Sequence, residues 1–316
     1  MKAAQISGYG DTSVIDINEV EVPVIRPGHV LVDVYAASIN PFDIKLRSGA
    51  MKDSMPLTFP MTIGGDFAGI VLDVGEGVSH VKAGDKVYGQ AYDLGTASGS
   101  FAEIALARAE HIALAPSNVT FEEAGALPLV GASAVQGMSE HIDLRAGQRI
   151  FITGGGGGIG SIAIQIAKHI GAYVATTATG GDIPFVKQWG ADEIIDYKQQ
   201  DPTDVLHDFD AVFDTVGGDT FNHSLEVLKQ GGVAISMATP VEASRAEQLG
   251  IRAFMQLTDV STALLGELRT LVEQDVVTVR IGKVFSLSQT REAFETREDG
   301  TFHGKAVVQV KQDVNL

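Results

Sequence analysis

A glycine-rich turn lies near the middle of this sequence, where Thr153 is followed by Gly154, Gly155, Gly156, Gly157, Gly158, Ile159 and Gly160. An apolar stretch over 149–153 precedes the turn, and apolar residues recur after it with the i, i+3, i+4 spacing of a buried helix face. A strand, a glycine turn and a helix start together direct backbone N–H groups and the positive end of a helix dipole toward a phosphate. Glycine leaves no Cβ between backbone and ligand and tolerates the positive φ of such a turn. This pattern predicts the pyrophosphate site of a dinucleotide-binding fold.

Two other interpretations of the glycine run fit less well. A flexible linker is disfavoured because a strand pattern and an amphipathic helix bracket the run, with no Ser/Pro-rich sequence around it. A kinase-type phosphate loop is disfavoured because no Gly-Lys-Ser/Thr follows the glycines. Several spacings of the fingerprint fit at once, and we take Gly154, Gly157 and Gly160 as the expected contacts.

The composition disfavours several classes of function. The chain has 316 residues, which suggests about two domains, and its 45% hydrophobic residues suffice for sizeable cores. The formal net charge of −17 repels nucleic acid and anionic lipid, so neither is expected as a partner. With no cysteine, the chain can form no disulfide, thiolate nucleophile or cysteine-ligated zinc. No apolar run is long enough to span a membrane and no leader opens the chain, so we expect a soluble, cytoplasmic protein.

The elements that must position the glycine turn follow two patterns. Up to about residue 120, short strands at 30–35, 69–74 and 86–89 alternate with glycine turns, which is typical of a β-barrel-like unit. A short helix is expected over 121–128, with Thr120 as its N-cap, and a longer one over 130–141. After the glycine turn, strand and helix patterns alternate. This predicts a parallel, doubly wound sheet with further strands over 173–178, 193–196, 211–216, 233–237 and 251–255.

The last part of the chain returns to strand-like sequence. A helix is expected from about Ser261 to Val272, followed by strands over 276–285 and 305–310. We infer that this tail completes the first domain. The expected organisation is therefore a barrel domain over 1–121 and 258–316, interrupted by a dinucleotide-binding domain over 122–257.

Several further motifs occur in a fixed order: Ala-Ser-Ile-Asn-Pro-Phe-Asp over 37–43, Gly-Gly-Asp-Phe-Ala-Gly over 64–69, Val-Gly-Glu-Gly-Val over 74–78, Ala-Gly-Asp-Lys-Val over 83–87, Gln-Ile-Ala-Lys over 165–168 and His-Gly-Lys over 303–305. Together with the glycine turn, they resemble the medium-chain dehydrogenase/reductase superfamily, and within it the zinc-independent, zeta-crystallin-like quinone oxidoreductases. The resemblance covers essentially the whole chain. It implies an α/β fold in which a GroES-like β-barrel domain is interrupted by a Rossmann domain with a doubly wound parallel sheet.

The departures from the zinc alcohol dehydrogenases bear on the chemistry. Those enzymes have a cysteine ligand where this chain has Asn40, and Gly-His-Glu where this chain has Gly64, Gly65 and Asp66. Without these ligands Asp66 and Asp43 are expected to be isolated carboxylates. The four-cysteine structural-zinc lobe is also missing, and the eight histidines are scattered without ligand spacing. We therefore expect no metal.

Without a Lewis acid, simple alcohol oxidation is a poor assignment. A quinone, or the β-carbon of an α,β-unsaturated carbonyl, takes hydride directly and leaves a delocalised oxyanion that a few hydrogen-bond donors can stabilise. The resemblance implies reduction of a quinone or enone by a nicotinamide cofactor. An enoyl-thioester reductase and a catalytically silent NADPH-binding redox sensor remain as alternatives.

Three residues are candidates for catalysis. The resemblance places Asn40 near the acceptor; the alternative is an Asn that stiffens the turn before a proline. Tyr92 falls in a loop region that could face the substrate, with packing or surface exposure as the other interpretation. Lys305 lies near the cofactor in relatives and could stabilise nicotinamide or phosphate oxygens, unless its motif is only a turn entering the last strand. Asp43 is expected to be structural, and with no general acid evident, solvent could deliver the proton.

The cofactor is expected to be NADPH, with NADH possible. An NAD-selective Rossmann fold carries an acid at the end of its second strand, and that position here falls at Ala178. Asp182 just downstream could partly play the acid's part. Lys187 and Lys198 are either phosphate partners or solvated lysines. Tyr197 matches a family tyrosine near the adenosine phosphate, or packs at a strand end.

The resemblance implies further cofactor contacts. One stands where the family usually has a threonine near the nicotinamide, and others follow the second, fourth and fifth strands of the sheet or precede the last strand of the chain. They are Ser133, Thr177, Ala178, Thr179, Val216, Gly217, Met237, Ala238, Thr239, His303 and Gly304. The family commonly forms homodimers through the edges of its Rossmann sheets, and the strand over 251–255 is the expected edge.

Overall fold

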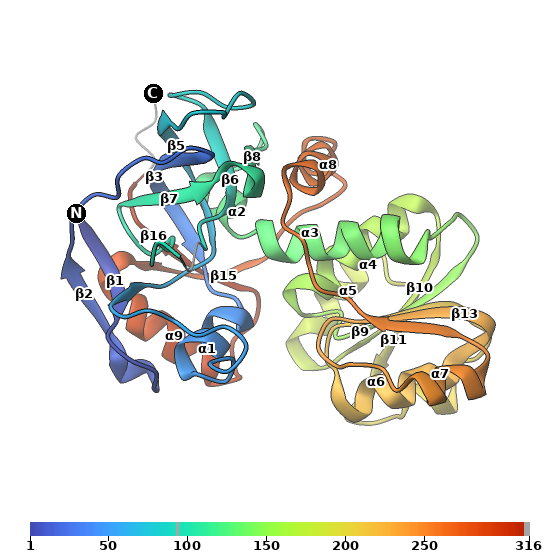
Figure 1. The fold of residues 1–316 in the computed structure, drawn as a ribbon. Coiled ribbons are helices and arrows are strands. Elements are labelled where there is room, and N and C mark those ends of the chain that lie inside the picture. The colour runs from blue at the N-terminus through green and yellow to red at the C-terminus, as the bar shows by residue number, and fades with distance from the viewer. Residues whose placement is uncertain (93–94, 313–316) are drawn as a thin grey trace. The chain divides into compact units, whose positions relative to one another are not determined.

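The structure is a computed structural model that describes residues 1–92 and 95–312 (Figure 1). The chain forms two compact units. The first, which we call the barrel unit, comprises Met1–Leu129, Val260–Glu273 and Val279–Leu316; the second, the sheet unit, comprises Val130–Asp259 and Gln274–Thr278. The domain bounds expected at 121/122 and 257/258 stay a prediction.

The sheet unit contains, within the described residues, a six-stranded sheet in the order β11-β10-β9-β12-β13-β14 with every pairing parallel. Its strands are β9 (Arg149–Thr153), β10 (Tyr173–Ala178), β11 (Glu193–Asp196), β12 (Phe209–Asp214), β13 (Leu228–Ser236) and β14 (Arg252–Met255). The chain moves outward from β9 to β11 and returns to β12 on the other side of β9. The strand order therefore reverses between β9 and β12, which is where such sheets bind ligands beyond the strand ends.

Apolar strands and helices make this sheet the core of its unit. Ile150, Phe151 and Ile152 of β9 are fully buried, which suits a central parallel strand covered on both faces. Helix α4 (Gly158–Ile170) packs its apolar face against β9 and β10. The other helices are α3 (Pro128–Gln136), which continues as a π-helical turn over Gly137–Ile142, α5 (Ile183–Gln188), α6 (Gly218–Ser224) and α7 (Ala243–Leu249).

The barrel unit is built from two antiparallel-rich sheets. Across the described residues, the larger has the order β15-β16-β3-β5-β6-β8, with β7 also paired to β3, and the smaller has the order β2-β1-β4. The strands are β1 (Lys2–Ile6), β2 (Ile15–Glu19), β3 (His29–Ser38), β4 (Met61–Thr62), β5 (Asp66–Val74), β6 (Lys86–Gln90), β7 (Ile104–Arg108), β8 (Ile112–Leu114), β15 (Ile281–Ser286) and β16 (Lys305–Gln309). Strand β16 pairs with β3, so the end of the chain joins the first sheet.

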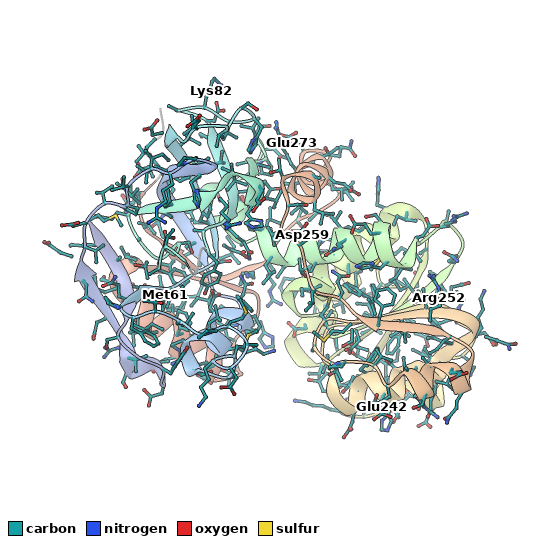
Figure 2. All side chains as sticks on the ribbon, viewed as in Figure 1. Met61, Lys82, Glu242, Arg252, Asp259 and Glu273 are labelled. Atoms are coloured by element: carbon teal, nitrogen blue, oxygen red, sulfur yellow. The ribbon has the colours of Figure 1, made fainter. Side chains whose placement is uncertain are left out.

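The interior of the barrel unit follows from alternation along its strands. Val30, Val32 and Val34 of β3 are fully buried, and the residues between them are less so. Figure 2 shows Met61 among the inner side chains of this unit and Lys82 at its outer edge. Within the described residues, the α-helices of this unit are α1 (Pro41–Ser48), α2 (Phe121–Gly125), α8 (Thr262–Glu273) and α9 (Thr290–Glu298).

Two local expectations have different outcomes. The N-cap at Thr120 is confirmed, because its hydroxyl accepts from the Glu123 N–H over 3.2 Å and the Glu123 carboxylate accepts from the Thr120 N–H over 2.8 Å. The strand expected over 276–285 begins only at Ile281. Before it, Thr278 exchanges hydrogen bonds with Gln165 of α4. This segment is therefore bonded to a helix of the sheet unit, and it pairs with none of the described strands. No helix in the described part of the chain is long and apolar enough to cross a membrane.

Candidate active site and dinucleotide site

The glycine run folds into a tight turn between β9 and α4. Gly154 has a φ of +69°, which L side chains rarely adopt, and its N–H donates to Thr177 Oγ1 over 2.9 Å. A Cβ on Gly160 would lie 2.3 Å from the carbonyl oxygen of Gly154, so this close approach requires glycine. Gly157 is the N-cap of α4, and no described side chain caps that helix end. Uncapped N–H groups and the positive end of the helix dipole fit a bound pyrophosphate.

A pocket of about 560 Å³ lies beside this turn within the sheet unit. Its walls come from the ends of β9, β10 and β12, the segment after β11, and α6. Tyr197 directly follows β11 and lines the pocket with a side chain that is 55% exposed, and its contact with the cofactor stays a prediction. Among the lining residues are Gly154, Thr177, Tyr197, Lys198, Val216 and His223.

Asp214, at the end of β12, organises the loops around this pocket. Its carboxylate is fully buried and accepts hydrogen bonds from Thr153 Oγ1 over 2.6 Å and from Ser236 Oγ over 2.7 Å. It also accepts from the N–H groups of Val216 and Gly217 over 3.2 and 2.9 Å. One carboxylate thus joins the carboxyl ends of three neighbouring strands. Asp214 was not predicted from the sequence, although an acid that ends an apolar strand three residues before Gly-Gly was a signal that could have found it.

Several other expected cofactor residues lie at the same end of the sheet. Ala178 ends β10 and is buried, and Thr179 after it forms a hydrogen bond with Asp196. Thr239 Oγ1 accepts from the N–H of Gly218 over 2.7 Å, which ties the Met237, Ala238 and Thr239 segment to the start of α6. Ser133 lies on α3, buried, with its hydroxyl 2.7 Å from Thr258 Oγ1, and it is not among the described residues that line the pocket.

The barrel unit contains a buried polar cluster, which we call the Asn40 cluster. Asn40 lies at its centre: Nδ2 donates to Asp66 Oδ2 over 2.8 Å, and Oδ1 accepts from Lys305 Nζ over 2.5 Å. The N–H of Asn40 donates to Asp43 Oδ2 over 2.5 Å, and Asp43 Oδ1 accepts from the Tyr92 hydroxyl over 2.5 Å. The structure thereby brings Asn40, Tyr92 and Lys305 together. Asn40 directly precedes α1, Tyr92 follows β6, and Lys305 is the first residue of β16.

The turn that precedes Lys305 directs this lysine into the Asn40 cluster. Gly304 has a φ of +89°, and His303 before it is exposed. Lys305 itself is only 5% exposed, and its Nζ also donates to the carbonyl oxygen of Ile39 over 3.3 Å. The His-Gly-Lys motif is therefore a turn entering the last strand and also the source of a buried cation.

Burial and charge set the ionisation of this cluster. Asp66 and Asp43 are 0% and 1% exposed, and burial raises the pKa of both carboxyls, that of Asp43 to about 6. Burial lowers the pKa of Lys305, while the two carboxylates oppose that effect. Burial and the neighbouring Asp43 raise the pKa of Tyr92 well above its usual value, so its hydroxyl keeps its proton at neutral pH.

Comparison with known proteins agrees with this architecture. The model of the alcohol dehydrogenase GroES-like domain matches residues 26–117, and that of zinc-binding dehydrogenase matches 189–308. The chain is 34% identical to a 2-methylene-furan-3-one reductase of Solanum lycopersicum, over 98% of this chain and 79% of that protein. The structure of a quinone oxidoreductase from Coxiella burnetii superposes with a TM-score of 0.89 at 33% identity, over 98% of this chain and 99% of that one. The chain belongs to the quinone oxidoreductase family of the medium-chain dehydrogenase/reductase superfamily.

This family membership makes the chain an oxidoreductase. A second similar structure, a quinone oxidoreductase of Escherichia coli complexed with NADPH, has a TM-score of 0.87 and 25% identity, and covers 98% of this chain and all (100%) of that one. The expected fold, a GroES-like barrel with a parallel-sheet Rossmann domain, is confirmed.

The Asn40 cluster does not fit a catalytic zinc, although one matching model is of zinc-binding dehydrogenases. A Cβ on Gly65 would lie 2.8 Å from ring carbons of Tyr92, so this ring fills the space where a ligand side chain would begin. The ammonium of Lys305 lies against Asn40, where its charge would oppose a metal ion. Among the described residues, no group of three or more His, Cys, Asp or Glu could hold a metal.

One expectation for this oxidoreductase is wrong. The sequence predicts isolated carboxylates at Asp43 and Asp66, but each accepts several hydrogen bonds, and Asn40 links them. A buried carboxylate needs such donors to offset its lost hydration. Tyr92 packs against the apolar core of the barrel unit and its hydroxyl donates to the buried Asp43 carboxylate, so its catalytic role stays a prediction.

Proposed function

We propose that this oxidoreductase transfers hydride from NADPH to a quinone or an α,β-unsaturated carbonyl without zinc. The observation that supports it most directly is the buried ammonium of Lys305 beside Asn40. An ammonium has three N–H donors, and the described residues accept from two of them, at Asn40 and Ile39. The third can stabilise the oxyanion that forms when hydride adds to a quinone or enone. Asn40 then positions Lys305, and Asp66 holds Asn40 in place.

In this proposal the sheet unit binds the dinucleotide. The N–H groups from Gly154 to Gly160 hold the pyrophosphate, Val216 and Gly217 border the bound cofactor, and Tyr197 and Lys198 lie where the adenosine phosphate would bind. Ala178 places no carboxylate against a 2′-phosphate, which favours NADPH over NADH. The bound nicotinamide supplies hydride, and the protein supplies orientation and the donor for the oxyanion.

The proposal is tested by the rate of NADPH oxidation, beside that of NADH, with a naphthoquinone and with a small enone as acceptors, on metal-free protein. Turnover with NADPH and either acceptor supports it. Tight NADPH binding without turnover across a broad panel of acceptors would instead indicate a binding protein, and turnover of enoyl thioesters alone would indicate a reductase of that class.

We further propose a homodimer and a cytoplasmic location. Strand β14 is an edge of the six-stranded sheet in the described part of the chain, and Met255 and Leu257 near it are 37% and 76% exposed. An exposed edge strand can pair with a second copy of the same strand. Light scattering that gives a monomeric mass would contradict the dimer, and cell fractionation tests the location. The net charge of −17 leads us to expect no nucleic-acid or membrane partner, which a gel shift and a vesicle pelleting assay would check.

A further inference from the structure

The two carboxylates of the Asn40 cluster differ in the chemistry of their donors. Asp66 accepts from amide groups: Asn40 Nδ2 over 2.8 Å, Gln90 Nε2 over 2.9 Å and the N–H of Leu129 over 3.2 Å. Amides neither gain nor lose protons in the ordinary pH range. Asp43 accepts from two backbone N–H groups and from the Tyr92 hydroxyl over 2.5 Å. The Asp43–Tyr92 contact is therefore an O–H···O hydrogen bond along which a proton can move.

Tyr92 is the more exposed residue of the Asp43–Tyr92 pair. Asp43, Asp66 and Lys305 are 1%, 0% and 5% exposed, whereas Tyr92 is half-buried. Among the titratable groups described in the cluster, Tyr92 alone is thus accessible from outside it. Gly65 lets the Tyr92 ring lie across the backbone, and the ring of Phe42 meets it edge-on with centroids 5.6 Å apart.

The charges around Asp43 suit storage of one proton. Burial raises the pKa of Asp43 to about 6, with Asp66 raising it further and Lys305 opposing the rise, so this carboxyl can hold a proton close to neutral pH. Arg297 of α9 acts on Lys305 as a further positive charge and lowers its pKa. Tyr92 gives up its proton only if it receives one from Asp43 in the same step. Asp43 then stores the proton, and Tyr92 transfers it.

We propose that Asp43 and Tyr92 form a proton relay that protonates the α-carbon of an enone after hydride has added to its β-carbon, an inference that rests on the proposed function. Hydride addition moves the C=C pair and leaves the substrate as an enolate. The Tyr92 hydroxyl gives its proton to the α-carbon, and the O–H pair stays on the tyrosine oxygen. That oxygen takes the proton of the Asp43 carboxyl, and solvent then returns a proton to the Asp43 carboxylate through the Tyr92 hydroxyl, the exposed end of the pair. One hydride and one proton have then added across the double bond.

Quinones make this relay separable from hydride transfer. Hydride addition to a quinone leaves an oxygen anion that water protonates quickly, whereas protonation of carbon is slow and needs a positioned acid. The test compares kcat for a naphthoquinone and a small enone in the wild type, Tyr92→Phe and Asp43→Asn. The matched control is Tyr88→Phe, because Tyr88 is a buried tyrosine on β6 whose hydroxyl donates to the carbonyl oxygen of Leu265 over 2.6 Å, which cannot exchange protons.

We expect Tyr92→Phe to lower the ratio of enone to quinone turnover by about 100-fold, the usual scale of a lost general acid, and Tyr88→Phe to leave that ratio unchanged. The limb of the enone pH profile assigned to Asp43, with rate falling as pH rises through about 6, should vanish in Asp43→Asn. An equal loss with both acceptors in Tyr92→Phe, or an unchanged ratio, overturns the relay. A wild type that reduces only the quinone also overturns it, whereas one that reduces neither acceptor refutes the proposed function itself.

A measurement on the cofactor-free protein gives an independent readout. Carbon-13 NMR of labelled aspartate should show a carboxyl titrating near pH 6 that is absent in Asp43→Asn. Tyr92→Phe should raise that pKa, because the hydroxyl stabilises the carboxylate it donates to. If Asp43→Asn does not fold, Tyr92→Phe decides by both readouts. A pKa that Tyr92→Phe leaves in place would contradict the pairing on which the relay depends.

Discussion

Replacing Asp214 by Asn should disturb the dinucleotide site without touching a ligand. Both oxygens of this carboxylate accept hydrogen bonds. Oδ1 accepts from Thr153 Oγ1 and the Val216 N–H, and Oδ2 accepts from Ser236 Oγ. The Gly217 N–H lies 3.2 Å from Oδ1 and 2.9 Å from Oδ2. An amide has one acceptor oxygen. With its oxygen in the Oδ1 position, the amide keeps its bonds from Thr153, Val216 and, over 3.2 Å, Gly217. Its NH₂ group then faces the Gly217 N–H at 2.9 Å, where neither group can accept a hydrogen bond.

The magnitude follows from these contacts. The charge-assisted hydrogen bond from the Gly217 N–H at 2.9 Å is lost, worth about 1.5–3 kcal/mol, while the longer contact at 3.2 Å remains. We therefore expect Asp214→Asn to lower the free energy of unfolding by about 1.5–3 kcal/mol. Because Asp214 also fixes the segment that carries Val216 and Gly217, NADPH affinity should fall at least about tenfold, equivalent to about 1.4 kcal/mol.

Asp210→Asn provides the control, because Asp210 lies at the other end of the same strand. Its carboxylate accepts from the Arg149 N–H over 2.7 Å and pairs with Lys229, away from the glycine turn. We expect a loss of about 1 kcal/mol in stability and no change in NADPH affinity. Urea unfolding and calorimetric titration of NADPH measure both quantities. An Asp214→Asn protein within about 1 kcal/mol of the wild type, with the same NADPH affinity, would refute the role assigned to this carboxylate.

Two further predictions follow from the geometry. Gly160→Ala would place a Cβ 2.3 Å from the Gly154 carbonyl oxygen, so the turn must shift, and we expect NADPH affinity to fall at least about tenfold and stability by about 1–3 kcal/mol. The control is Gly266→Ala in α8, where nothing lies within 4 Å of the new Cβ and no loss of stability is expected. Equal effects of the two substitutions on NADPH affinity would contradict this prediction. Folding raises the pKa of Asp43 from 3.8 to about 6, so the protonated carboxyl stabilises the fold below pH 3.8 by about 3 kcal/mol, and this stabilisation is lost as pH rises through 6. The free energy of unfolding should therefore depend less on pH in Asp43→Asn. The same pH dependence in the variant and the wild type would show that the pKa shift belongs to another group.

The sequence alone determined the elements of the dinucleotide site. The strands expected over 149–153, 173–178 and 193–196 match β9, β10 and β11 to the residue, and α4 begins within the glycine run. These features are local, because apolar periodicity and the conformational freedom of glycine act over a few neighbouring residues. The choice of Gly154 and Gly160 also has a local basis, since the turn folds back on itself within seven residues.

The Asn40 cluster was decided by tertiary structure. Asn40 meets Asp66 from 26 positions away and Lys305 from 265 positions away, and Tyr92 reaches Asp43 across 49. These contacts depend on the register of β16 against β3 and of β3 against β5, which no short stretch of sequence specifies. The sequence supplied the residue types and, through the family resemblance, the candidates Asn40 and Lys305. Only the folded chain shows that two carboxylates, a lysine and a tyrosine share one buried network, because burial and mutual charge arise from the pairing of distant strands.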